Sequence, residues 1–286
     1  MKLLLLGSTG LLGPAIAAQA STRGHQVVGA ARKGAEIVVD IADDAQLGEA
    51  LARVEPDAVV NCAALTCVDD CERDPGLAYR VNARPLSVLA EWSKSNSRKL
   101  LHISTDHYFT TGGARPHGEA EPVHLVNEYA RSKYAGEAFA LTSPHALVIR
   151  TAIVGIRGWE KPTLAEWAIG AIEAGDELTM FDDAFTSCID VSSLAGAALD
   201  LLDQGATGLF NVASREVFTK GDLIREIARQ MDRPLKATRA SVNDLSPARP
   251  SSLGLDVGAA EQRLGYHLPT LEQVVSAVLK QYKGSA

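Results

Sequence analysis

The sequence has no excess of positive charge and no long apolar run. Acidic residues outnumber basic ones by 35 to 28 over 286 residues, so the formal net charge is −7. Proteins that bind the phosphate backbone of nucleic acids present a broad positive surface, and we therefore expect no nucleic-acid partner. A membrane-spanning helix needs about 18 or more apolar residues in succession. No stretch reaches this length, so we expect no membrane partner and a cytoplasmic location.

The sequence also lacks the features of a secretory signal peptide. Residues 1–6 read MKLLLL, but this run stops at Gly7 and no small-residue cleavage site follows it. A signal peptide has a longer apolar region that leads into such a site. We therefore predict a strand over 2–6.

Cysteine is scarce, and its spacing does not suit a metal. Zinc sites normally use C-x-x-C pairs or histidine partners at ligand spacing, and neither accompanies Cys62, Cys67, Cys71 or Cys188. Cys67 and Cys71 would share one face of a helix. We expect no metal and interpret the four cysteines as small buried thiols in a reducing compartment.

Apolar and charged residues, at 46% and 22% of the chain, are typical of a globular protein. In the first half, short apolar runs alternate with alanine-rich amphipathic stretches, as expected for parallel strands covered by helices on both faces. We predict strands at 2–6, 25–31, 57–63, 99–104 and 146–151. We predict helices at 11–22, 44–53, 75–95, 128–142, 162–174, 190–203, 219–231 and 269–282.

This order of elements predicts an α/β fold with a doubly wound, parallel Rossmann-type sheet and a smaller, discontinuous C-terminal substrate-binding lobe. We expect an NAD(P)-binding Rossmann domain over 1–160, with a returning segment near 184–215. Residues 161–286 would form mainly the substrate-binding lobe.

A glycine-rich loop joins the first predicted strand to the first predicted helix. In a Rossmann unit, such glycines allow a tight turn, a close approach to the cofactor pyrophosphate and close packing of the helix on the sheet. The alternative is a plain strand-to-helix turn. The loop residues are Gly7, Ser8, Thr9, Gly10, Leu11, Leu12 and Gly13.

The end of the second strand favours NADP(H), with NAD(H) as the alternative. A carboxylate usually holds a free 2′-hydroxyl at this position, whereas a 2′-phosphate needs room and cations. Ala31 stands where this carboxylate would be, so no acidic side chain is present there. Arg32 and Lys33 supply positive charge, although such a pair also occurs on surfaces for solubility. Asp40 and Ile41 could hold the adenine, or Asp40 could be a cap or turn residue.

Tyr129 and Lys133 are four residues apart and therefore share a helix face. A nearby ammonium favours the phenolate and so lowers the pKa of a tyrosine, and it can also donate to ribose hydroxyls. The alternative is a structural pair. Tyr134 has alanine four residues later, so we interpret it as a residue that packs or that buries its ring and keeps its hydroxyl at the surface.

Ser104 and Thr105 end an apolar strand, at the edge where open α/β sheets bind ligands. The Thr105 hydroxyl could hydrogen-bond a substrate oxygen, although a threonine often simply closes a strand. The glycine loop, this strand end and the Tyr-Lys helix converge on one sheet edge, which predicts an oxidoreductase site.

The sequence resembles the extended short-chain dehydrogenase/reductase family, and within it the dTDP-4-dehydrorhamnose reductase group. The resemblance runs nearly end to end, and its middle segment is the most specific. The matching segments are GSTGLLG (7–13), DAVVNCAALTCVDDCERDPGLAYRVNA (57–83), ISTDHYF (103–109), NEYARSKYAGE (127–137), RT (150–151), GLFNVAS (208–214) and ARPSSLGLD (248–256).

The resemblance implies an NADPH-dependent reductase that transfers hydride to the ketone of a nucleotide-linked deoxysugar. It implies that Tyr129 donates the proton, Lys133 binds the ribose and Thr105 holds the ketone oxygen. It further implies that one set of residues forms the wall of the cofactor site, together with an asparagine that supports it, and that a second set contacts the substrate. The wall and support are Asn61, Cys62, Ala63, Ala64 and Asn82. The substrate contacts are Thr66, Asp106, His107, Ile153 and Arg249, of which Arg249 would reach the diphosphate or lie on the surface.

The substrate side departs from the group's usual pattern. Residues 152–155 replace a Trp-Val-Tyr run, 161–164 replace an asparagine-phenylalanine contact, and 185–188 replace a G-x-P-T turn. His107 replaces a tyrosine and could be a proton relay, a substrate contact or a hydrogen-bonded loop residue. Two alternatives therefore stay open: an epimerase or dehydratase that retains NAD, and a non-catalytic NADP-binding regulatory subunit. A homodimer is the commonest assembly for such enzymes.

Overall fold

The computed structural model describes residues 1–285, and its contacts divide the chain into two units. Unit 1 comprises Met1–Thr105, Leu125–Arg150 and Ala195–Phe210. Unit 2 comprises Asp106–His124, Thr151–Leu194 and the residues from Asn211 onward. Within the described range, no helix combines the length and apolar character needed to cross a membrane.

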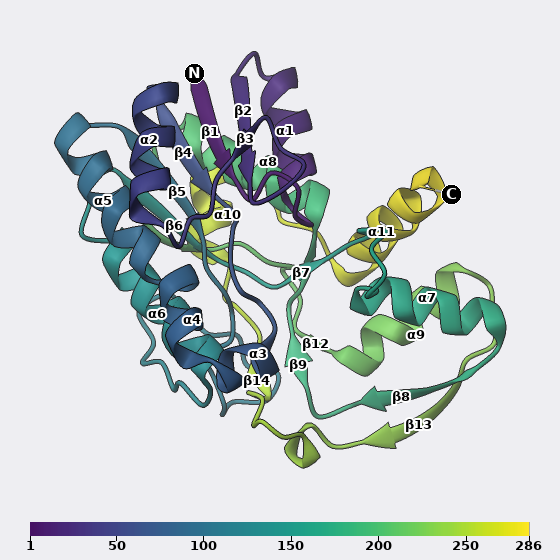
Figure 1. Ribbon diagram of the computed structural model, residues 1–286. Coiled ribbons are helices and arrows are strands. Elements are labelled where there is room, and N and C mark those ends of the chain that lie inside the picture. The colour runs from purple at the N-terminus through teal and green to yellow at the C-terminus, as the bar shows by residue number, and fades with distance from the viewer. Residues whose placement is uncertain (286) are drawn as a thin grey trace. The chain divides into compact units, whose positions relative to one another are not determined.

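Unit 1 is built on a seven-stranded sheet in the order β11-β6-β5-β4-β1-β2-β3 (Figure 1). The strands from β3 to β6 run parallel, and β1 lies between β2 and β4, with Leu3 opposite both Val27 and Ala58. Consecutive strands extend outward on either side of β1, which confirms the doubly wound α/β fold. The strands are β1 (Lys2–Leu6), β2 (Gln26–Ala31), β3 (Ile37–Val38), β4 (Ala58–Asn61), β5 (Lys99–Ile103), β6 (Ala146–Arg150) and β11 (Gly208–Asn211).

Helices cover both faces of this sheet, with α2, α5 and α6 on one face and α1 and α8 on the other (Figure 1). The strands between them are therefore apolar on both sides, and the side chains of Leu3–Leu6 are fully buried. The helices are α1 (Gly13–Thr22), α2 (Asp44–Val54), α3 (Val68–Arg73), α4 (Pro75–Asn82), α5 (Arg84–Asn96), α6 (Glu128–Ala140) and α8 (Val191–Asp203).

The single helix predicted over 75–95 is wrong, because the structure has two helices there. Ala83 is both the C-cap of α4 and the N-cap of α5, and its φ of −116° with ψ −55° departs from the ordinary helical φ of about −63°. Pro85 lies in the first turn of α5 and has no N–H to continue the hydrogen bonding of α4. The short helix α3, just before α4, was not predicted.

Unit 2 has short strands around a three-helix core. Helices α7, α9 and α11 bury a cluster that includes Ile169, Ile224 and Val278. The helices α7 and α9 each begin with a capping box, Thr163 with Glu166 and Thr219 with Asp222. The strands are β7 (Ile153–Val154), β8 (Glu177–Phe181), β9 (Phe185–Thr186), β10 (Ile189–Asp190), β12 (Phe218–Thr219), β13 (Lys236–Ala240) and β14 (Ser252–Leu253). The helices are α7 (Leu164–Ala174), α9 (Lys220–Gln230), α10 (Gly258–Leu264), α11 (Leu271–Ser285) and the 3-10 turn η1 (Val242–Asp244).

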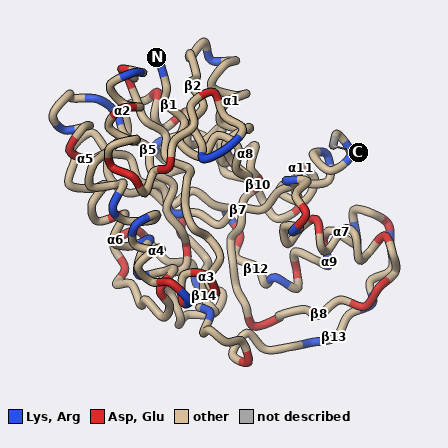
Figure 2. Tube along the Cα trace, viewed as in Figure 1, with Lys and Arg blue, Asp and Glu red and all other residues tan. Residues whose placement is uncertain are grey.

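Charged residues of both signs are interspersed along the chain (Figure 2). Of the cysteines, Cys71 and Cys188 are buried as predicted, whereas Cys62 and Cys67 are only half-buried. Burial raises the pKa of the Cys62 and Cys188 thiols to about 12, so both stay protonated at neutral pH.

Candidate active site

The glycine loop makes a tight turn between β1 and α1. Gly7 has φ +79°, and its N–H donates to the Ala30 carbonyl at 2.9 Å. A Cβ atom at Gly13 would lie 2.4 Å from the Ser8 carbonyl oxygen, so only glycine allows this approach. Leu12 is the N-cap residue of α1 and has no side-chain acceptor. The first N–H groups of α1 are thus suited to an anionic ligand, and the loop fits a dinucleotide pyrophosphate.

Two cations follow β2. Arg32 and Lys33 are exposed, and neither has a hydrogen bond or ion pair with another residue in 1–285. Asp40, by contrast, accepts from the Ala42 N–H at 3.0 Å, which is the turn role left open from the sequence. Ile41 is buried, and the contact of Asp40 and Ile41 with adenine stays a prediction.

The predicted cofactor wall lies directly against the glycine loop. A Cβ atom at Gly7 would be 2.7 Å from the Ala63 nitrogen, which shows how closely the two backbones approach. The Asn61 side chain is fully buried, where its Oδ1 accepts from Ala63 N–H at 3.1 Å and its Nδ2 lies 3.3 Å from Nδ1 of His102. Asn61 therefore shapes the backbone wall formed with Cys62, Ala63 and Ala64.

Asn82 connects this wall to the Tyr-Lys helix. Its Oδ1 accepts from the Leu65 N–H at 2.8 Å, and its Nδ2 donates to the Leu65 carbonyl and to Ser132 Oγ, each at 3.0 Å. Leu65 belongs to the loop after β4, and Ser132 lies on α6 beside Lys133. Asn82 thus fixes the loop to the helix, and its support of the cofactor site stays a prediction.

Helix α6 buries both members of the predicted catalytic pair. Asn127 caps the helix by accepting from the Ala130 N–H at 2.8 Å. Lys133 is 2% exposed, and its Nζ donates to the Ile103 carbonyl at 2.8 Å. Tyr129 packs in a small cluster with Val68 of α3 and Ala78 of α4.

The Lys133 ammonium is therefore held at the end of β5, just before Thr105, which is itself buried. Burial lowers the pKa of Lys133 to about 8, and Glu137 and Cys62 oppose this change. Tyr134, predicted to pack or to keep its hydroxyl at the surface, is 36% exposed.

A buried ion pair lies one turn beyond Lys133 and was missed in the sequence. Glu137 and Arg150 are 2% and 3% exposed in their side chains. Arg150 donates to Glu137 through Nη2 at 2.5 Å and Nε at 3.1 Å, and Ser104 Oγ donates at 2.9 Å. The spacing of Glu137 four residues after Lys133 places both on one helix face and could have identified Glu137 as a neighbour of Lys133, but it carries no signal for the pairing with Arg150.

Unit 2 contains most of the predicted substrate contacts. Asp106 is buried and His107 half-buried, and both directly follow Thr105 in the chain. Burial, together with Lys220 and Arg249, lowers the pKa of His107 to about 3. The imidazole is therefore neutral at physiological pH, which argues against a relay through an imidazolium. The Arg249 guanidinium donates to the Pro247 carbonyl at 2.9 Å.

The two remaining predicted substrate contacts, Thr66 and Ile153, lie in different units. Thr66 is exposed in unit 1. Ile153 is half-buried in unit 2, where β7 pairs with β10 and Ile153 lies opposite Ile189. Their contact with substrate stays a prediction.

Two segments that depart from the group's pattern have structural roles in unit 2. Thr163 caps α7, and its Oγ1 also donates to the Gly155 carbonyl at 2.7 Å. Residues 185 and 186 form β9 between β12 and β14, and Ser187 Oγ accepts from the Leu255 N–H at 2.9 Å. These contacts give Thr163 and Ser187 structural roles.

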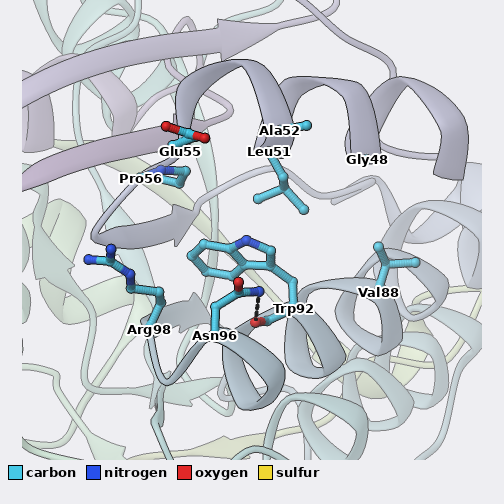
Figure 3. A pocket seen from close by; sticks show the side chains of 9 residues that line it. All are labelled: Gly48, Leu51, Ala52, Glu55, Pro56, Val88, Trp92, Asn96 and Arg98. Atoms are coloured by element: carbon cyan, nitrogen blue, oxygen red, sulfur yellow. Dashed lines mark hydrogen bonds between the residues drawn. The ribbon is translucent and has the colours of Figure 1, made fainter.

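A pocket of about 660 Å³ lies elsewhere in unit 1, between α2 and α5 (Figure 3). Leu51 and Trp92 face one another across it, and Pro56 and Arg98 line it just before β4 and β5 begin. The candidate catalytic residues are at the carboxyl ends of the strands, so this pocket belongs to the opposite edge of the sheet.

The chain is similar to known proteins over most of its length. Residues 1–283 match the family model described as the RmlD substrate binding domain. The chain is 33% identical to a probable low-salt glycan biosynthesis reductase, Agl14, of Haloferax volcanii, and the match covers 97% of each chain. It is 34% identical to the dTDP-4-dehydrorhamnose reductase of Mycobacterium tuberculosis over 75% of this chain and 70% of that protein.

A solved structure extends the likeness to the fold. The dTDP-4-dehydrorhamnose reductase of Bacillus anthracis, in complex with NADP, superposes with a TM-score of 0.87 at 22% identity. The superposition covers 98% of this chain and 97% of that one.

Proposed function

Because the chain belongs to the RmlD substrate binding domain family, we propose that it is an NADPH-dependent reductase for the ketone of a nucleotide-linked deoxysugar or a related substrate. The chain is an oxidoreductase of the extended short-chain dehydrogenase/reductase type, like the reductases it resembles over most of its length. The observation that carries the proposal is Lys133, buried on the same face of α6 as Tyr129 and held by the Ile103 carbonyl.

NADP(H) is the preferred cofactor, with NAD(H) as the weaker alternative. The glycine cradle at Gly7 and Gly13 would hold the pyrophosphate, and Arg32 and Lys33 would pair with the 2′-phosphate. When bound, the reduced nicotinamide supplies hydride to the carbonyl carbon. Asn61 through Ala64 would form the wall beside it.

Three side chains of unit 1 would bind the carbonyl oxygen, protonate it or stabilise the group that protonates it. Thr105 donates a hydrogen bond to it, and Tyr129 transfers its phenolic proton to the alkoxide that forms when the carbonyl carbon is reduced. The Lys133 ammonium stabilises the resulting phenolate and can donate to the ribose. Its hydrogen bond to Ile103 keeps it oriented, and two further N–H groups of the ammonium remain for these roles.

The substrate is a small molecule, and we propose that it carries a nucleoside diphosphate. Arg249 supports this, since a guanidinium fork suits phosphate oxygens. In this proposal, unit 1 binds the cofactor and unit 2 supplies most substrate contacts. We further propose a cytoplasmic homodimer, which analytical ultracentrifugation would test.

Replacing Tyr129 with phenylalanine tests the proposed chemistry. The change removes the proton donor with little change in shape, so kcat with dTDP-4-dehydrorhamnose and NADPH should fall at least a hundredfold. Tyr134→Phe, on the exposed side of the same helix, is the matched control and should retain activity. Survival of Tyr129→Phe turnover within tenfold of wild type would contradict the mechanism.

Two alternatives make different predictions. Denatured protein that releases stoichiometric NAD would favour an epimerase or dehydratase. A specific protein partner, together with no NADPH oxidation across a panel of ketones, would favour a regulatory subunit. In both cases the reductase proposal would be wrong.

A further inference from the structure

His102 is a buried histidine of unit 1 that the proposed mechanism does not use. It lies on β5, opposite Asn61 of β4 on one side and Val148 of β6 on the other. Its side chain is fully buried. The pairing with both neighbouring strands fixes the backbone of His102, so a substitution of the side chain should leave the sheet in register.

The contacts of Asn61 determine which nitrogen of this imidazole carries the proton. Asn61 Oδ1 accepts from the Ala63 N–H at 3.1 Å, so the amide group that lies 3.3 Å from His102 Nδ1 is the Nδ2 donor. His102 Nδ1 must then accept, and the proton of the neutral ring is on Nε2. Burial and the Lys133 ammonium lower the pKa of His102 well below its ordinary value of 6.5, so the ring is neutral at physiological pH.

The second ring nitrogen of His102 adds nothing to the stability of the core. Nε2 is buried and makes no hydrogen bond with any residue in 1–285. A buried N–H without an acceptor is unfavourable, and an apolar side chain would avoid this penalty. The hydrogen bond between Nδ1 and Asn61 is therefore the contact that explains an imidazole at this position.

The Asn61 amide connects this imidazole to the proposed cofactor wall. Its Oδ1 holds the backbone at Ala63, and Ala63 lies against the glycine loop, since a Cβ atom at Gly7 would be 2.7 Å from the Ala63 nitrogen. A half-turn of the amide would exchange its oxygen and nitrogen and release the Ala63 N–H. The acceptor on His102 favours the orientation in which the oxygen faces Ala63.

We infer that His102 is a positioning residue for the cofactor site. Its Nδ1 orients the Asn61 amide, the amide holds the turn at Ala63, and this turn keeps the wall against the glycine loop. The inference rests on the proposed function, because it takes residues 61–64 as the wall beside a bound dinucleotide.

Two substitutions of nearly equal shape separate the hydrogen bond from the volume of the side chain. His102→Leu removes the acceptor, whereas His102→Asn keeps an oxygen acceptor near the position of Nδ1. Isothermal titration without a ketone would measure the dissociation constants of NADPH and NADH. Loss of an ordinary hydrogen bond corresponds to about a threefold to tenfold loss of affinity. We expect this loss in His102→Leu and a recovery toward the wild-type affinity in His102→Asn.

Thermal unfolding distinguishes positioning from a structural role. His102→Leu leaves the Asn61 Nδ2 without its acceptor but also removes the unpaired Nε2–H, so the two effects oppose each other. We expect its Tm to lie within about 3 °C of the wild-type value. An equal loss of affinity in both variants, or a loss in His102→Leu that accompanies a larger fall in Tm, would overturn the inference and leave His102 only a structural role.

A double substitution tests the path through Asn61. In an Asn61→Leu background, His102→Leu should cause little further loss of nucleotide affinity, because both residues act through the same amide. Losses that add independently would overturn the inference.

The protonated nitrogen can be observed in the wild-type protein itself. A long-range ¹H–¹⁵N spectrum at neutral pH, in which the His102 signals are identified by their loss in His102→Asn, should show a proton on Nε2 and none on Nδ1. A proton on Nδ1 would contradict the inference, because Nδ1 could not then accept from Asn61.

Failure of the inference and failure of the proposed function give different results. Unchanged nucleotide affinity in His102→Leu would overturn the inference alone, provided that the wild type reduces a ketone with NADPH in a parallel assay. If the wild type bound neither nucleotide, the proposed function would be wrong and the inference would fall with it.

Discussion

At the scale of single residues, the protonation of Lys133 should set the alkaline limit of activity. Burial lowers its pKa to about 8, and only the charged form stabilises a phenolate. We therefore expect kcat/KM for ketone reduction to fall as pH rises above about 8. A pH–rate profile at saturating NADPH measures this, and a flat profile up to pH 10 would contradict it.

The lowered pKa of Lys133 also makes the free energy of unfolding depend on pH. The folded pKa of Lys133 is about 8 and the ordinary value is 10.5, so between these values the unfolded chain binds more protons. The contribution of this group to the free energy of unfolding therefore rises with pH in that window.

Glu137 should position and tune Lys133 rather than take part in the reaction. Its carboxylate raises the pKa of Lys133 and is held by Arg150 and Ser104. Glu137→Gln should move the alkaline limb of the pH–rate profile to lower pH. It should also destabilise the fold by about 3–5 kcal/mol, because Arg150 is left as an uncompensated buried charge.

The conservative variant Glu137→Asp provides the control for Glu137→Gln. It keeps the negative charge, so we expect the alkaline limb to return toward its wild-type position. If Glu137→Gln lowers stability but leaves the pH–rate profile in place, Glu137 has only a structural role.

At the scale of secondary-structure elements, the close contact between α4 and α6 determines where the Tyr-Lys face lies. A Cβ atom at Gly136 would lie 2.1 Å from the Asn82 carbonyl oxygen. Gly136→Ala must therefore push the helices apart, which we expect to cost about 1–3 kcal/mol in unfolding free energy and to reduce kcat. Chemical denaturation and steady-state kinetics measure the two effects.

Gly48 offers the matched control within the same unit. It lies in α2, where an added Cβ meets nothing within 4 Å. Gly48→Ala should therefore stabilise the protein by about 0.5–1 kcal/mol through helix propensity. If Gly136→Ala and Gly48→Ala changed the unfolding free energy and kcat equally, the close approach of α4 and α6 would have no special importance.

The elements of unit 1 could largely be predicted from the sequence, and the reasons differ by residue. Leu3–Leu6 identify a strand because the run is apolar on both faces, and Tyr129 and Lys133 share a face because their spacing is helical. Pro85 carried a usable signal for the end of α4 that the predicted helix over 75–95 ignored. The pairings of Glu137 with Arg150 and of Gly136 with Asn82 were beyond sequence reasoning, because they depend on how α6 packs in three dimensions.

At the scale of the whole molecule, cofactor preference should appear as thermal stabilisation. A ligand at a hundred times its dissociation constant stabilises the folded state by about 2.7 kcal/mol, which raises Tm by roughly 5 °C. At equal concentration we expect NADPH to raise Tm more than NADH, and Arg32→Ala to reduce this difference. Arg53→Ala, an exposed arginine of α2, is the control. A larger shift with NADH would show that the 2′-phosphate prediction is wrong.

The position of β11 in the sheet has a consequence for how the protein is made. β11 (Gly208–Asn211) is the neighbour of β6 (Ala146–Arg150), so about 60 residues of intervening chain separate two adjacent strands. At roughly 5–20 residues per second, a ribosome needs several seconds to supply them. During that interval the edge of β6 is uncovered on the nascent chain, and a transcript or protease product that ends near residue 160 would expose it permanently. Such an edge is a template for aggregation, so the returning segment protects the newly synthesised protein as well as completing its sheet.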